Sequence, residues 1–280
     1  MADALSTAKH SPLRRVVRAE REEIGRIADV LRSGALAPRV VLIDDPENIE
    51  QAIACDVHVD ALYATERMLE QGLPRLRGAA HDEPFRIIDA ESSRRLFRGQ
   101  KDARVFALAR APRPLRPRDL LKRPGDVLVL DGVRLVGNIG AVTRTAGALG
   151  AAGVILVDSG LRSITDRRLI RASRGLVFSV PVVLAGRAEC VDFLSRERLQ
   201  VATLSAGAAE PLDALREVTG RLALVLGSER HGVSRQLDKI TQHRCAIPMT
   251  ADAESLNVSV AAGIALYERH QVRDAAGRAL

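Results

Sequence analysis

Polar side chains that could bind and position a ligand follow several apolar runs in the second half of the sequence. Five of them stand where a predicted strand ends or the next helix begins: Asn138, Arg144, Glu229, Ser255 and Asn257. The segment 247–249, Ile-Pro-Met, ends another such run. In an open α/β sheet, ligands bind at the carboxyl ends of the strands, so we expect these groups to gather at one site.

Each of these residues also has an ordinary structural explanation when it is considered alone. Asn138 and Ser255 could cap helices, because short polar side chains accept hydrogen bonds from the first helical turn. Arg144 could form a surface ion pair, and Glu229 could be a carboxylate at a helix start. The combination of segments, rather than any one residue, therefore has to carry a functional interpretation.

Several other kinds of active site lack their sequence signatures. Gly132, Gly137 and Gly140 follow a strand but do not form G-x-G-x-x-G, which argues against a nicotinamide oxidoreductase. Walker A, H-E-x-x-H and G-x-S-x-G patterns are absent from the sequence. Three widely spaced cysteines predict neither a disulfide framework nor a zinc site.

The composition favours an α/β protein with a polyanionic partner. Hydrophobic residues make up 46% of the 280 residues but aromatic residues only 2%, so the core must consist of Val, Leu, Ile and Ala. The net charge of +7 suggests a partner such as a nucleic acid. The first 15 residues lack the apolar stretch of a secretory signal, and no run is long enough to span a membrane. Reduced cysteines make the cytoplasm the simplest location.

The chain alternates apolar runs with helical segments in two series. In the first half, we predict strands at 39–45, 57–65, 85–89 and 105–110, with a helix that starts at Ser11-Pro12 and continues to about residue 31. In the second half, apolar runs occur at 126–132, 153–159, 176–186, 200–206, 221–229 and 244–249, and a last helix covers 256–272. This alternation predicts a parallel sheet covered on both faces.

A proline-rich segment separates the two series. Residues 111–126 contain four prolines and five basic residues and show no sustained periodicity, as expected for a linker. We therefore predict an N-terminal α/β/α domain at residues 1–110, a basic linker at 111–125 and a larger domain at 126–280.

The order and spacing of the polar segments resemble the three motifs of the SpoU methyltransferases. The matching residues are Asn138-x-Gly140-x-x-x-Arg144, then Gly-Ser-Glu229, then Ile-Pro-Met followed by Glu-Ser255-Leu-Asn257. Members of that family transfer a methyl group from S-adenosylmethionine to a ribose 2′-hydroxyl of RNA. The second motif departs from the common Gly-Asn-Glu, because Ser228 replaces the asparagine and Arg-His-Gly follows the glutamate.

The resemblance extends over nearly the whole chain. KDARVFALARAPRP, GDVLVLDGVRLVGNIGAV, DRRLIRASRG and AESLNVSVAAGIALYER are similar to the thiostrepton and nosiheptide resistance methyltransferases. The resemblance implies a knotted, SPOUT-type catalytic domain, a homodimer whose active site is completed across the interface, and an N-terminal domain similar to kink-turn-binding ribosomal proteins. It also implies that the substrate is an adenosine in the thiopeptide-binding region of 23S rRNA, without any metal.

The resemblance assigns roles to individual residues. Seven residues would hold the cofactor: Leu204, Gly227, Glu229, Ile247, Met249, Ser255 and Leu256. Asn138, Glu229, Ser255 and Asn257 would hold the site together and orient Arg144. Arg144 either removes the 2′-hydroxyl proton or, since a guanidinium normally stays charged, stabilises the developing alkoxide. Arg171 matches an arginine that contacts RNA or the active site.

A basic stretch in the first half could hold the RNA. Residues 91–123 contain eleven Lys and Arg against three Asp and Glu. We expect Arg95, Arg98 and Lys101 to contact phosphates and Phe97 to stack on a base, although Phe97 could also be an ordinary core residue. The alternatives to the rRNA assignment are the same chemistry on tRNA or another rRNA nucleotide, and a non-enzymatic rRNA-binding protein.

Overall fold

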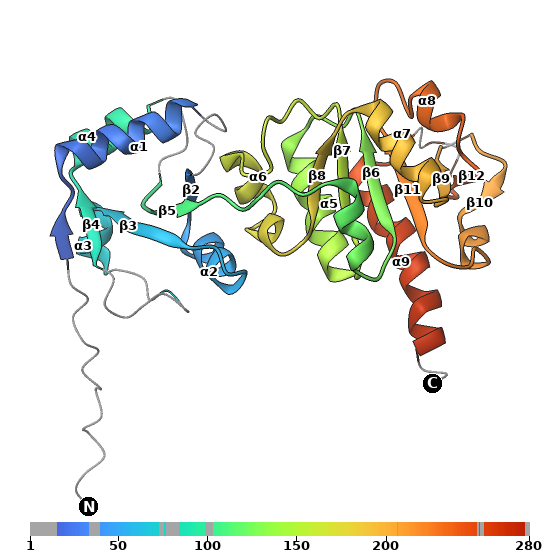
Figure 1. The fold of residues 1–280 in the computed structure, drawn as a ribbon, viewed down its shortest axis with the longest axis horizontal. Helices are drawn as coiled ribbons and strands as arrows, with labels where there is room; N and C mark the ends of the chain where they lie inside the picture. The colour runs from blue at the N-terminus through green and yellow to red at the C-terminus, as the bar shows by residue number, and fades with distance from the viewer. Residues whose placement is uncertain are drawn as a thin grey trace, which may run out of the picture.

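The computed structural model describes residues 16–33, 40–72, 76, 84–98, 103–205, 207–250, 252 and 255–277. These residues form two β-sheets with their helices, which lie side by side along the chain (Figure 1). The first sheet ends at Arg110 and the second begins at Val127. No helix among the described residues is long and apolar enough to cross a membrane.

The N-terminal sheet mixes parallel and antiparallel pairs. Its strand order is β1 (Val16–Arg18), β4 (Phe85–Ile88), β3 (Val59–Thr65), β5 (Val105–Arg110) and β2 (Val40–Asp44). The accompanying helices are α1 (Arg21–Ser33), α2 (Pro46–Ala54), α3 (Glu66–Gln71) and α4 (Ala90–Leu96). Tyr63 stacks on Phe106 at 5.0 Å between ring centroids, and Phe97 meets Phe106 edge-on at 5.5 Å. The few aromatic residues of the chain are thus concentrated in this core.

The predicted N-terminal helix is wrong over its first part. Ser11-Pro12 lies outside the described residues, and Val16 and Val17 form strand β1, which pairs in parallel with β4. Helix α1 begins only at Arg21, with Glu22 and Glu23 in its first turn. Adjacent β-branched residues fit a sheet edge well, and tertiary pairing outweighs the helical spacing read from the sequence.

The C-terminal sheet is parallel throughout, as predicted. Its order is β10 (Glu210–Pro211), β12 (His243–Ala246), β9 (Gln200–Leu204), β11 (Leu222–Gly227), β6 (Val127–Asp131), β7 (Gly153–Val157) and β8 (Val182–Ala185). The run at 176–186 divides into a 3₁₀ turn, η3 (Leu176–Phe178), and strand β8. The knot implied by the family resemblance stays a prediction.

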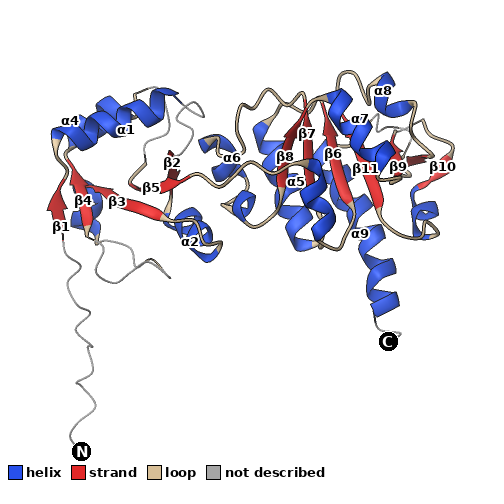
Figure 2. Cartoon of the chain, in the orientation of Figure 1, coloured by secondary structure: helices blue, strands red, loops and turns tan. Residues whose placement is uncertain are grey.

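Helices cover both faces of this sheet (Figure 2). Alternate residues of β6 enter two separate core clusters: Leu128 and Leu130 join the helices α5 (Val136–Ala148) and α9 (Val258–Gly277), whereas Val127 and Val129 join α7 (Arg187–Arg196) and α8 (Arg235–Asp238). Because side chains alternate along a strand, a strand buried on both faces must be apolar throughout, as these runs are.

The proline-rich segment is docked rather than extended. Pro117–Lys122 form a 3₁₀ helix, η2, whose Leu120 is fully buried in the core cluster of α7 and α8. Arg118 donates to Glu197 at 2.8 Å, and Arg123 donates to the carbonyl of Ser179 at 2.7 Å. The absence of periodicity indicated a linker, but these contacts bind the segment to the C-terminal sheet.

A buried ion pair network joins the two halves of the protein. Asp44, at the end of β2, is fully buried and contacts Arg167 and Arg171 of α6 (Arg167–Ala172). The Arg167–Asp44 distance is 2.9 Å, and the Arg167 guanidinium also lies 4.8 Å from the Phe97 ring centre. The carboxylate therefore ties the N-terminal sheet to a helix of the C-terminal domain.

A second buried ion pair anchors the last helix. Arg269 of α9 donates to Asp126 at 2.9 Å, and its other nitrogens donate to the carbonyls of Leu215, Val218 and Gly220 at 2.7–2.8 Å. Arg269 is 3% exposed and Asp126 is 1% exposed. Asp126 directly precedes β6. The pair therefore fixes α9 at the amino edge of the sheet.

We expect Arg269→Met to lower the free energy of unfolding by about 3–5 kcal/mol, because it leaves a buried carboxylate without its cationic partner and three carbonyls without their donor. Urea denaturation measures the change. Arg216→Gln is the matched control: it removes an exposed ion pair to Glu268 on the same helix, and such pairs contribute at most about 1 kcal/mol. Equal losses in the two variants would contradict the anchoring role.

Candidate active site

A cavity of about 560 Å³ opens at the carboxyl edge of β9, β11 and β12. Every residue predicted to hold the cofactor lines it: Leu204, Gly227, Glu229, Ile247, Met249, Ser255 and Leu256. The volume lies within the range of small-molecule sites, and the lining combines apolar and polar residues. We call this space the cofactor cavity.

A tight turn after β11 shapes the wall of the cofactor cavity. Ser228 and Gly232 form an isolated β-bridge, and the amide of Gly232 donates to the carbonyl of Ser228 at 2.8 Å. A Cβ atom on Gly227 would lie 2.0 Å from the carbonyl carbon of Gly232, far inside contact distance. The turn can therefore close only if residue 227 has no side chain.

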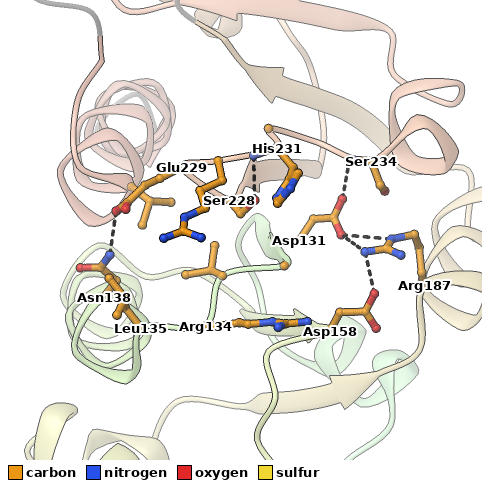
Figure 3. A pocket seen from close by; sticks show the side chains of 15 residues that line it. Asp131, Arg134, Leu135, Asn138, Asp158, Arg187, Ser228, Glu229, His231 and Ser234 are labelled. Atoms are coloured by element: carbon orange, nitrogen blue, oxygen red, sulfur yellow. Dashed lines mark hydrogen bonds and ion pairs between the residues drawn. The ribbon is translucent and has the colours of Figure 1, made fainter.

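Three of the predicted catalytic side chains form one hydrogen-bonded chain. Asn257 donates to the side-chain oxygen of Asn138 at 3.2 Å. Asn138 in turn donates to Glu229 at 3.2 Å (Figure 3). These residues are as many as 119 positions apart in the sequence. The structure thus brings side chains from all three motif segments together at one edge of the sheet.

The start of α9 is capped by Asn257 rather than by Ser255. The Asn257 side-chain oxygen accepts from the backbone amide of Ser259 at 2.8 Å and from its hydroxyl at 2.6 Å. Ser255 lies before the helix, is exposed and lines the cofactor cavity. Ser255 is thus placed to meet a ligand, while Asn257 joins the helix cap to the hydrogen-bonded chain.

A second pocket of about 550 Å³ adjoins the cofactor cavity and shares its Ser228–Gly232 turn (Figure 3). It is lined by Arg134, Asn138, Asp158, Arg187 and Arg230 among others, and we call it the arginine pocket. Glu229 lines both spaces, and Asn138 lines the arginine pocket.

Arg144 lies outside both cavities. It is exposed on α5, and it makes no hydrogen bond or ion pair with any residue that the structure describes. Six residues separate it from Asn138, which places the two side chains about 120° apart around the helix. Because Asn138 points to Glu229, Arg144 cannot point into the same space. Within one chain, the residues predicted to orient Arg144 therefore do not contact it.

Two of the predicted RNA contacts are instead internal. Phe97 is 1% exposed and packs on Phe106, so its ring cannot stack on a base, and its interpretation as a core residue is correct. Arg171 has a side chain 18% exposed and held against Asp44, so it joins the domains rather than offering a free cation. Arg95 and Arg98 are exposed, which an RNA contact requires, and their role stays a prediction. Lys101 lies outside the described residues.

Three further charged residues at this sheet edge could have been found from the sequence, because they follow or end predicted strands. Asp131 ends β6, Asp158 directly follows β7, and Arg187 begins α7 after β8. Arg187 contacts Asp131 at 3.0 Å and Asp158 at 2.6 Å, and the hydrogen bond to Asp131 raises the pKa of Arg187. These residues stand at the same sheet edge as the motif residues but lie outside the motifs, so attention to the motifs alone missed them.

Other reactive groups are poorly placed for chemistry. Burial raises the pKa of Cys190 to about 12 and that of Cys245 to about 11, so both are neutral thiols near pH 7. In the ranges that the structure describes, no group of three or more His, Cys, Asp or Glu residues could hold a metal ion. His231 stands on the shared turn and lines both cavities.

Two family models cover most of the chain. The SpoU rRNA Methylase family matches residues 126–267, and the N terminus of the thiostrepton-resistance methylases matches residues 13–123. The chain belongs to the SpoU rRNA methylase family. It is therefore a methyltransferase whose methyl donor is S-adenosylmethionine, and the cofactor cavity, with its predicted lining complete, fits that donor.

Relatives match over nearly their full length. The chain is 44% identical over 91% of its length to a 23S rRNA (adenosine(1067)-2′-O)-methyltransferase of Streptomyces azureus, of which 95% is covered. It is 42% identical over 88% of its length to the protein of the same name from Streptomyces laurentii, of which 91% is covered.

Solved structures show the same fold in both domains. An RNA 2′-O ribose methyltransferase superposes with a TM-score of 0.73 at 27% identity, over 92% of this chain and 99% of that one. A SpoU methyltransferase from Streptomyces viridochromogenes gives 0.74 at 21% identity, over 91% and 99%. Because these superpositions cover both sheets, the solved structures share the two-sheet architecture of this chain.

We expect Gly227→Ala to weaken S-adenosylmethionine binding by at least about tenfold, because the added methyl group forces the Ser228–Gly232 turn away from its closed form. Isothermal titration calorimetry measures the affinity. Gly186→Ala is the matched control, since a Cβ there meets nothing within 4 Å. Unchanged affinity in a folded Gly227→Ala protein would show that the turn does not shape the cofactor cavity.

We expect Asp44→Asn to loosen the contact between the domains, because Arg167 and Arg171 lose the charge of their buried partner. The cost should be about 3 kcal/mol or more, against at most about 1 kcal/mol for Asp192→Asn, which removes a surface pair with Arg196. Scanning calorimetry should show the N-terminal domain melting at a lower temperature. A thermogram like that of Asp192→Asn would contradict the prediction.

Proposed function

We propose that the protein methylates the ribose 2′-oxygen of an adenosine in the thiopeptide-binding region of 23S rRNA and thereby confers resistance to thiopeptide antibiotics. The Asn257–Asn138–Glu229 chain carries the chemical part of the proposal, because it joins all three motif segments beside a cavity fit for the cofactor. The near full-length similarity to the two Streptomyces enzymes supports the substrate. A ribosomal substrate would place the enzyme in the cytoplasm.

The reaction requires the 2′-oxygen to approach the sulfonium methyl group in line with the bond that breaks, so positioning supplies much of the catalysis. The 2′-hydroxyl must also lose a proton. Arg144 either takes that proton or, as a charged guanidinium, stabilises the alkoxide while a phosphate or water takes it. Asn138 and Glu229 would hold the geometry of the motif segments around the reacting atoms.

A homodimer would bring Arg144 to a cofactor cavity. Arg144 is exposed and faces away from the cavities of its own chain. Val260, Ile264 and Tyr267 lie three or four residues apart on α9, where Val260 is 49% exposed and Tyr267 is 53% exposed. An apolar stripe of this kind beside the site fits a partner chain. We therefore infer that Arg144 serves the active site of the partner subunit.

The N-terminal domain would hold the RNA, with the kink-turn-binding resemblance as its model. Arg94, Arg95 and Arg98 are exposed on and after α4, and Arg67, Arg94 and Arg104 line a hollow of about 760 Å³ at the ends of α3, α4 and β5. Clustered arginines on one surface give the phosphate contacts that dominate RNA affinity.

The decisive experiment maps the methylated ribose. Labelled S-adenosylmethionine is incubated with the protein and a 23S rRNA fragment containing the thiopeptide-binding region, and the product is read by reverse-transcription stops and mass spectrometry. We expect one 2′-O-methyladenosine in that region. Methylation of tRNA or another rRNA nucleotide instead would transfer the proposal to that substrate, and RNA binding without methyl transfer would overturn it.

Subunit complementation tests the role of Arg144. Arg144→Gln and Gly227→Ala are each expected to lose most activity as homodimers. A purified heterodimer of the two variants should recover about half of the wild-type rate per dimer, because one intact cofactor cavity then meets one intact Arg144 of the other chain. An inactive heterodimer would show that Arg144 acts within its own chain.

A further inference from the structure

The arginine pocket contains cationic groups that the protein itself does not neutralise. Arg134 comes from the segment between β6 and α5, and Arg230 comes from the shared turn on the other side of the pocket. Both are exposed, and neither makes a hydrogen bond or ion pair with a residue in the described ranges. Figure 3 shows Arg134 lying across the pocket from Ser228 and His231. Two free guanidinium groups in one pocket are a built site for an anion.

Three other charged groups of the pocket are paired with one another, and Glu229 accepts a hydrogen bond from Asn138. Asp131 accepts from Arg187 through one oxygen and from the amide of Ser234 at 2.7 Å through the other, and Arg187 also contacts Asp158 (Figure 3). These contacts fix the Arg187 side chain in the lining of the pocket. The acidic residues are held around it, which leaves Arg134 and Arg230 to meet a ligand.

The position of the pocket indicates which anion it receives. It shares the Ser228–Gly232 turn with the cofactor cavity, and Glu229, which lines both spaces, accepts a hydrogen bond from Asn138 on the side of the arginine pocket. In an internal RNA nucleotide, the 2′-oxygen is on the carbon next to the one that bears the 3′-phosphate. A 2′-hydroxyl presented to the cofactor cavity therefore brings its own 3′-phosphate to the neighbouring space.

We propose that Arg134 and Arg230 form the subsite for the 3′-phosphate of the nucleotide that is methylated. The proposal rests on the proposed 2′-O-methyl transfer and adds the residues that fix the target nucleotide. Guanidinium groups bind phosphate oxygens in pairs, and such charge-assisted contacts also set the orientation of the ribose. Arg230 directly follows Glu229 of the second motif, so the turn that carries that motif also supplies part of this subsite.

A chemical double-mutant cycle tests the contact directly. The RNA fragment is prepared with a neutral methylphosphonate in place of the 3′-phosphate of the target adenosine, and it is compared with unmodified RNA on wild-type, Arg134→Gln and Arg230→Gln proteins. Each arginine substitution should weaken RNA binding by about tenfold, and so should the methylphosphonate. An arginine variant should bind the methylphosphonate RNA little worse than either single change predicts. Fully additive losses would overturn the proposal.

Salt dependence and cofactor affinity separate the possible sources of the anion. Loss of one phosphate contact should lower the slope of log affinity against log salt by about 0.7–0.9, while the S-adenosylmethionine affinity stays within twofold. If instead the cofactor affinity falls and the RNA affinity does not, the arginines bind the methionine carboxylate and the proposal fails. Arg235→Gln is the control, because it removes an exposed arginine near the site that lines neither cavity.

These measurements remain informative if the rRNA assignment is wrong. Binding and the cycle are measured on whichever RNA the wild-type protein methylates, so a different substrate changes the fragment and not the test. If the wild type methylates the 23S fragment but the losses in binding free energy are additive in the double-mutant cycle, only the phosphate subsite is rejected. Absence of methyl transfer to any RNA would reject the proposed function and this subsite with it.

Discussion

The buried contact between Arg269 and Asp126 determines where the active site can form. It holds one part of α9 at the amino edge of the parallel sheet, where Asp126 also accepts from the amide of Leu222 at the start of β11. Twelve residues of helix separate Arg269 from Asn257, which corresponds to about 18 Å. Strands β6 and β11, of five and six residues, span about 17–20 Å. The helix therefore carries Asn257 to the opposite edge, beside Asn138 and Glu229.

The parallel arrangement of the strands explains why the cofactor residues could be found from the sequence. All the strands that end at the cavity run in the same direction, so polar residues after each apolar run must collect at one edge. Strand ends and the motif order both pointed to Gly227, Ile247 and Leu256, and the structure places all three on one cavity. The buried strands were equally readable, since their apolar runs are continuous.

The residues that were placed wrongly depend on information that local patterns do not contain. The burial of Phe97 arises from packing on Phe106 and from Arg167 of the other domain, and Arg171 meets a carboxylate more than 120 positions away in the chain. Val16 and Val17 form a strand only because β4 offers an edge. For Arg144, helical geometry alone would have shown that it and Asn138 cannot serve one cavity, and a second chain is then the simplest remedy.

The contact between the domains also reaches the active site. Asp44 holds α6 through Arg167, and α6 packs so closely on α5 that a Cβ on Gly140 would lie 2.4 Å from the Ala172 side chain. Helix α5 in turn carries Asn138 and Arg144. The glycine of the first motif is thus needed for the fit between α5 and α6 rather than for a phosphate loop. Because these contacts connect β2 to α5, an RNA bound by the N-terminal domain, as proposed, would lie at a fixed distance from the reacting ribose. A nucleotide would then be selected by its separation from the bound RNA structure as much as by contacts to its base.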